Sequence, residues 1–89
     1  MLSWPPINLT DAIARLVIDE SIVRTEIIPR GQVTSDTIVD AKRVLGNLYR
    51  KPIQRIKAEF PHLQFRVETH HFITDDLKAI IFAIVTREA

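Results

Sequence analysis

A chain of 89 residues is long enough for one small domain but not for two. The sequence has no cysteine, which excludes disulfides, cysteine nucleophiles and thiolate metal sites, and its 46% hydrophobic and 26% charged residues are typical of a globular fold. The formal net charge is only +1, but positions 42–57 contain six basic residues and no acidic one, so the rest of the chain carries −5. Such segregation creates a local positive field that the net charge conceals.

Residues 1–7 are expected to form an N-terminal arm ahead of a single domain at residues 8–89, because Pro5 and Pro6 favour an extended backbone. Trp4 on this arm either covers one end of the core or contacts a partner. We expect no secretory signal, because no basic flank with a following apolar stretch opens the chain, and no membrane span, because the longest apolar run is far shorter than roughly 20 residues. A cytoplasmic location is the expectation.

Residues 9–21 are predicted to form the first helix, with Asn8 as its N-cap and a one-sided apolar face. Residues 23–28 are rich in β-branched side chains and are predicted to form a short strand. Proline and glycine in residues 29–32 then indicate a turn.

A second helix is predicted to begin near Ser35, capped by Thr34 or by Ser35 itself. Its apolar residues step by three and four along one face until the pattern meets Pro52. Since proline cannot donate a backbone N–H, either one long helix kinks there or a second helix starts with Pro52 in its first turn. Pro61 ends the helical segment.

Residues 63–73 alternate between apolar and polar side chains and are predicted to form a half-buried strand. A turn is expected at residues 74–76. Residues 78–86 are apolar on both faces, so a strand there would be central in a sheet or buried by a partner. A helix over residues 77–84 remains an alternative, although the β-branched content favours a strand.

The predicted order is α-β-α-α-β-β, which indicates an α+β domain. The order resembles that of winged-helix proteins, and this resemblance implies a wing at residues 70–76 and a helix-turn-helix bend near Gly46 or Pro52. The alternative is a fold in which helices pack on one face of an antiparallel sheet.

The basic segment is predicted to form an exposed helical stripe. Arg43, Arg50 and Lys57 are spaced seven residues apart, so they share one face at about 100° per residue. A solvated surface helix would also be rich in basic residues, but it would normally mix both signs of charge. We therefore expect a small non-enzymatic nucleic-acid-binding or regulatory protein. The candidate nucleic-acid-binding residues are Lys42, Arg43, Asn47, Arg50, Lys51, Gln54, Arg55 and Lys57.

The alternative function is a homo-oligomeric interaction or assembly module. In that case the basic helix would dock an acidic protein surface, and Ile80, Phe82 and Ile84 would form the oligomer interface. A homodimer is expected under either hypothesis.

The sequence contains no motif of a catalytic or metal site. There is no phosphate-binding glycine loop and no nucleophile motif, and the neighbouring carboxylates Asp75 and Asp76 fit a turn. His70 and His71 are neighbours on a predicted strand, so their side chains should point to opposite faces. We expect no enzyme activity, no cofactor and no metal.

Overall fold

The computed structural model describes residues 8–89, so the predicted arm with Trp4 lies outside the described residues. The chain forms an α+β domain with the predicted order of elements. The helices and strands are α1 (Leu9–Ala14), β1 (Ser21–Ile28), α2 (Ser35–Asn47), α3 (Arg50–Glu59), β2 (Phe65–Ile73) and β3 (Ala79–Arg87).

The three strands form an antiparallel sheet in the order β1-β3-β2. The prediction that the last segment is a strand is confirmed, and its central place explains why both of its faces are apolar. In β3 the odd-numbered residues Ala79, Ile81, Ala83 and Val85 are completely buried, whereas the even-numbered residues Ile80, Phe82 and Ile84 are partly exposed.

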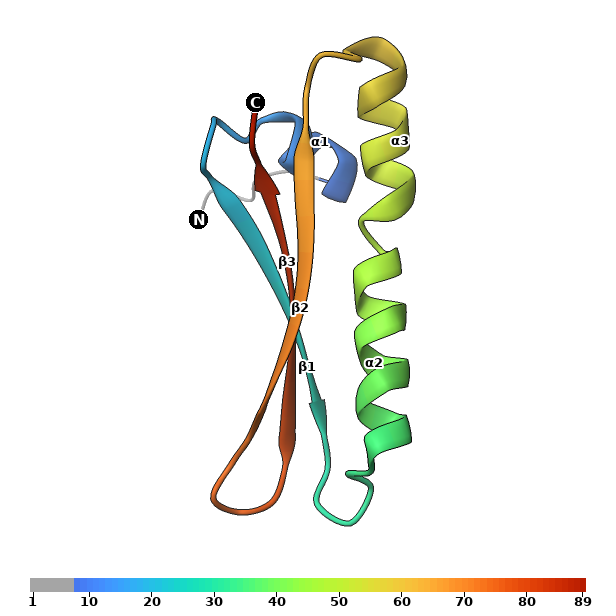
Figure 1. Cartoon of the computed structure of the whole chain (residues 1–89), viewed down its shortest axis with the longest axis vertical. Helices are drawn as coiled ribbons and strands as arrows, with labels where there is room; N and C mark the ends of the chain where they lie inside the picture. The colour runs from blue at the N-terminus through green and yellow to red at the C-terminus, as the bar shows by residue number, and fades with distance from the viewer. Residues whose placement is uncertain (1–7) are drawn as a thin grey trace, which may run out of the picture.

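The helices pack on one face of this sheet, which is the second of the two predicted architectures. Helix α2 contacts all three strands, and α3 packs against α1. Figure 1 shows α2 and α3 in line along one side of the twisted sheet, with α1 and the C-terminus towards the same end of the molecule. The core between the layers includes Ile13, Leu16, Leu45, Tyr49, Ile56 and Leu63 together with the odd-numbered residues of β3.

Helices α2 and α3 are separated by a short break and not by a tight bend. Pro52 lies in the first turn of α3 and cannot donate a hydrogen bond to the carbonyl of Leu48, four residues earlier. Leu48 and Tyr49 nevertheless keep right-handed helical dihedrals, so the chain continues in nearly the same direction. The resemblance to winged-helix proteins therefore holds for the order of elements, but no helix-turn-helix forms.

The first helix is shorter than predicted, because it ends at Ala14 and not at residue 21. The backbone N–H of Asp19 donates to the carbonyl of Arg87 at 2.8 Å, and the N–H of Arg87 donates to the carbonyl of Glu20 at 3.1 Å. Pairing with β3 thus begins before Ser21, and a positive φ of 70° at Asp19 turns the chain into β1. Val17, which lies within the predicted range of the helix, is 60% exposed.

The predicted wing is also shorter than expected. Residues 70–73 belong to β2, so the connection to β3 is the turn at residues 74–78. The N–H of Thr74 donates to the carbonyl of Lys78 at 2.8 Å, which closes this hairpin tightly.

Candidate functional site

The outer side of α2 and α3 carries an exposed ridge of polar and basic side chains. It lies opposite the side that buries Leu45, Tyr49 and Ile56. Because α2 and α3 continue nearly in line, side chains spaced by seven residues follow one another along this side. The structure thus brings together five of the eight predicted nucleic-acid-binding residues. We call them the outer ridge: Arg43, Asn47, Arg50, Gln54 and Lys57, all exposed.

Arg43 is the one cation of the outer ridge that is neutralised by an acidic neighbour. Its guanidinium lies 2.5 Å from the carboxylate of Asp40, one turn earlier and just outside the basic segment. Within residues 8–89, no ion pair joins an acid to Arg50, Lys51, Arg55 or Lys57. The uncompensated positive charge therefore lies on α3.

The other three predicted residues lie beside the outer ridge and not on it. Lys42 is half-buried, whereas Lys51 is exposed next to Arg50 at the start of α3. Arg55 faces α1 and lines a hollow of about 230 Å³ together with Asp11 and Glu59. Two acidic side chains thus lie near Arg55, so Arg55 contributes less than Arg50 or Lys57 to the positive potential outside the helices.

The sheet face opposite the helices is open and largely apolar. Val23 and Ile27 of β1 and Phe72 of β2 are 53%, 61% and 59% exposed. Through the strand register they share this face with Ile80, Phe82 and Ile84, the predicted oligomer interface. The contribution of β1 and β2 to this face was not predicted, although residues 23–28 alternate between apolar and polar side chains in a way that indicates it. We call this surface the open face: Val23, Thr25, Ile27, Glu68, His70, Phe72, Ile80, Phe82 and Ile84.

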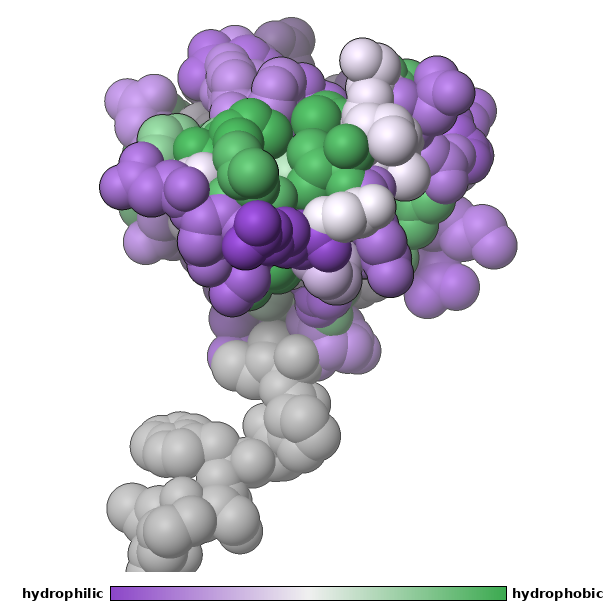
Figure 2. Space-filling model, turned by 90° about the horizontal axis from the view of Figure 1, so that it is seen from below, coloured by the Kyte–Doolittle hydropathy of each residue, from purple (hydrophilic) through white to green (hydrophobic). Residues whose placement is uncertain are grey.

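A second apolar surface lies at the end of the molecule where the β1–α2 loop meets the β2–β3 turn. Val33, Ile73 and Leu77 line a hollow of about 350 Å³ there, together with Arg30 and Gly31. Figure 2 shows hydrophobic side chains gathered at this end and ringed by hydrophilic ones. Gly31 has a φ of 88°, which a side-chain-bearing residue rarely adopts, so the loop that forms this rim requires glycine.

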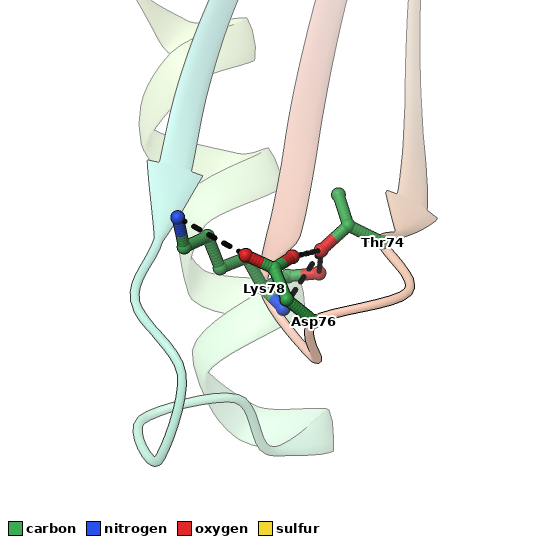
Figure 3. A network of polar contacts seen from close by, with 3 residues as sticks. All are labelled: Thr74, Asp76 and Lys78. Carbon is green, nitrogen blue, oxygen red and sulfur yellow. Dashed lines mark hydrogen bonds and ion pairs between the residues drawn. The ribbon is translucent and has the colours of Figure 1, made fainter.

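Of the two adjacent carboxylates in the β2–β3 turn, that of Asp76 stabilises the turn itself. The hydroxyl of Thr74 donates to Asp76, and the Lys78 ammonium lies 3.2 Å from the same carboxylate, as Figure 3 shows. The hydrogen bond from Thr74, with a further contribution from Lys78, holds the pKa of Asp76 below its usual value. Asp76 is therefore an ionised turn residue.

The histidines do not converge on one position. His70 pairs with Phe82 and His71 with Ile81, so the two side chains lie on opposite faces of the sheet, as predicted. Within residues 8–89, no three histidine, aspartate or glutamate side chains are grouped as a metal ion would require. Over the same range, no helix has the length and apolar composition that crossing a membrane demands.

Comparison with protein families gives one match. A family model described as a domain of unknown function, DUF7609, matches residues 8–89. The chain belongs to the DUF7609 family. The matched region begins at Asn8, the N-cap of α1, and includes every helix and strand of this DUF7609 domain. No curated protein and no solved structure matches the chain.

Proposed function

We propose that this DUF7609 protein binds nucleic acid through the outer ridge and its neighbour Lys51, without catalysing a reaction. One observation carries the proposal: the basic side chains of α3 project from one rigid helix and have no ion-pairing partner among residues 8–89. Arginine and lysine at such positions suit phosphate oxygens, while Asn47 and Gln54 are able to donate to phosphates or base edges.

The placement of these charges is unfavourable for the isolated helix. Arg50 and Lys51 occupy the first turn of α3, where the helix dipole favours acidic residues, and no acid stands in that turn. A surface helix normally offsets such charges with acids three or four residues away, but the first acid in α3 is Glu59. An anionic ligand would supply the compensation that the helix lacks.

The dimensions of the outer ridge favour contact with a nucleic-acid backbone. From Arg43 to Lys57 the helical path is about 21 Å at 1.5 Å per residue. That length corresponds to about six base pairs of duplex at 3.4 Å each. The outer ridge would therefore follow a run of phosphates, which predicts binding with a strong salt dependence and little dependence on sequence.

Fluorescence anisotropy of labelled duplex DNA and single-stranded RNA at low and moderate salt tests this function. With three phosphate contacts from Arg50, Lys51 and Lys57, the slope of log affinity against log salt on duplex should be about −2.7. We expect Arg50→Glu with Lys57→Glu to abolish binding at moderate salt. The matched control, Arg15→Glu with Arg30→Glu, makes the same charge change at exposed arginines away from the outer ridge and should retain most of the affinity. Unchanged affinity in the first variant would remove the outer ridge as the binding surface.

A second candidate function is an assembly module, and the open face is the observation that favours it. An exposed apolar surface of this kind commonly marks a protein interface. In this case the outer ridge would dock an acidic protein surface, and a homodimer would form through Ile80, Phe82 and Ile84. Duplex binding that is absent even at low salt, together with self-association in light scattering, would favour this candidate over the first.

A further inference from the structure

The two unusual surfaces of this domain lie on opposite sides. Helices α2 and α3 cover one face of the sheet, and the outer ridge lies on the side of these helices that faces away from the core. The open face is the other side of the same sheet. A second molecule that covers the open face therefore leaves the outer ridge accessible.

The open face changes from apolar to polar along the strands. At the end near the β2–β3 turn, Ile27, Ile80 and Phe72 form a wholly apolar row across the three strands. Thr25, Phe82 and His70 form the next row. At the far end, Ser21, Thr86 and Arg66 form a polar row, reached through a row of Val23, Ile84 and Glu68.

We propose that two copies of this chain pack their open faces together about a two-fold axis parallel to β3, and that the resulting dimer bridges two nucleic-acid segments. The bridging rests on the proposed function, whereas the dimer does not. The partner is a second copy because the pattern of rows is self-complementary and because the charge distribution favours this approach.

The row pattern selects the direction of the axis. With the axis parallel to β3, each row meets the same row of the other copy, so Ile80 lies opposite Ile80 and Ile27 lies opposite Phe72. An axis perpendicular to the strands would instead bury Arg66 and Thr86 against the apolar row, which costs free energy because polar groups lose water without new partners. In the parallel arrangement Arg66 and Glu68 lie on an edge strand, at the rim of the interface.

Charge also directs a second copy to the open face. The uncompensated cations of α3 would repel each other if two molecules met through their helices. The one acid of the open face, Glu68, is paired with the neighbouring Arg66, whose Nε lies 3.6 Å from its carboxylate. Two open faces therefore meet without a net electrostatic penalty.

The area of the open face is enough for a weak dimer. Strands of eight and nine residues are about 27–30 Å long, and three strands are about 14 Å across, which gives a flat area of roughly 400 Å² for each copy. Two copies would bury about 800 Å² of flat area, and more when the protruding side chains are included. That value lies below the roughly 1,200 Å² of most specific interfaces and within the range of weak, transient ones, so dimerisation should depend on concentration.

The order of layers in the dimer determines where nucleic acid can bind. The dimer would have four layers, helix–sheet–sheet–helix, with the two sheets about 10 Å apart. The two copies of the outer ridge then face in opposite directions. Each copy would bind a different segment, so the dimer would bring two segments together.

The first experiment changes the open face without changing charge. Ile27→Gln with Phe72→Gln alters two well-exposed side chains of the apolar row, and Val17→Gln with Val39→Gln is the matched control at exposed apolar positions elsewhere. Light scattering across concentrations should show a dimer for the original chain and the control, and a monomer for the first variant. A bead-bound duplex should capture a second, labelled duplex through the original chain and the control only.

Each outcome separates the dimer from the bridging. A chain that stays monomeric to about millimolar concentration overturns the dimer, because even a weak, specific dimer should be populated at that concentration. A dimer that binds duplex but captures no second duplex overturns the bridging alone. A dimer that binds no duplex at all supports the interface and removes both the bridging and the proposed function.

A second experiment tests the axis without relying on a destabilising change. Because the chain has no cysteine, Ile80→Cys introduces a single reactive thiol. A bis-maleimide linker of about 10 Å, which matches the spacing of packed sheets, should join two copies efficiently. Val39→Cys, placed on the exposed side of α2, should not be joined. Equal yields from the two variants would overturn the proposed arrangement.

Discussion

The two faces of β3 differ in size of side chain as well as in exposure. The covered face places Ala79 and Ala83 beside Ile81 and Val85, all completely buried, whereas the open face carries only the large side chains Ile80, Phe82 and Ile84. Small residues let α2 approach the sheet closely. Large residues on the other side protrude, which suits a surface that a further layer covers. The sizes of the apolar side chains thus distinguish the face of β3 that packs against helices from the face that is left open.

The two sides differ equally in charge. The helix side carries the outer ridge, with the unpaired cations Arg50 and Lys57 on α3, whereas the open face is mostly apolar and its Glu68 is paired with the neighbouring Arg66. We infer that the same sheet separates a surface suited to anions from one suited to self-association.

Truncation of one side chain on each face of β3 should reveal the largest difference in stability between the covered and the open face. Ile81→Ala should lower the free energy of unfolding by about 3 kcal/mol, because it leaves a cavity in a packed core. Ile80→Ala should lower it by about 1 kcal/mol or less, because this side chain remains partly exposed in the single molecule.

Chemical denaturation at a low protein concentration gives both values for the monomer. At a high concentration, a dimer through the open face should make Ile80→Ala costlier than in the monomer, while the cost of Ile81→Ala should rise little. Equal costs for the two variants at low concentration would contradict the distinction between a covered and an open face.

The assignment of strands was predictable because residues 63–73 alternate between apolar and polar side chains and residues 78–86 are rich in β-branched side chains. The length of α1 was not predictable, since Leu16 and Val17 both fit a helical face and only pairing of Asp19 and Glu20 with Arg87 decides where the helix ends. Such pairing joins residues far apart in sequence, and local spacing contains no information about it.

Tyr49 anchors the covered side, and its loss should have a smaller effect. Its hydroxyl donates to the carbonyl of Ala83 at 2.7 Å in the core. Tyr49→Phe should cost about 1 kcal/mol of unfolding free energy, because a buried carbonyl loses its partner. Urea denaturation of the two proteins measures this difference, and no change would show that the bond does not stabilise the core.

The buried hydroxyl of Tyr49 should also make the stability of the fold depend on pH in the alkaline range. Burial raises the pKa of Tyr49 above 10.0, although Arg24 offsets part of the shift. The unfolded chain therefore loses the proton first, so stability is fully present below pH 10 and falls as the pH rises through the pKa of the folded state. Tyr49 is the only tyrosine, so its ultraviolet absorbance reports this titration directly. Tyr49→Phe should remove this component of the decline.

The candidate site was only partly predictable from sequence. The seven-residue spacing located Arg43, Arg50 and Lys57 on one exposed side, and that placement is observed. The neutralisation of Arg43 was missed because Asp40 stands two residues before the basic segment, so a count within the segment excluded it. A charge that lies one helical turn away belongs to the same surface whatever boundary is drawn in the sequence.

Removal of the acid that pairs with Arg43 should have the smallest effect, and this effect should be specific to the outer ridge. Asp40→Asn keeps the shape of the side chain but removes the carboxylate that lies 2.5 Å from Arg43. Under the proposed function, the freed cation adds one phosphate contact, so duplex affinity should rise and the salt slope should steepen by about 0.9. Asp75→Asn is the matched control, because it makes the same change at an exposed acid of the β2–β3 turn and should leave the slope unchanged. Anisotropy titrations at several salt concentrations measure both slopes. An equal shift in the two variants would mean that only the net charge matters, and the distinction between the outer ridge and the rest of the surface would then fail.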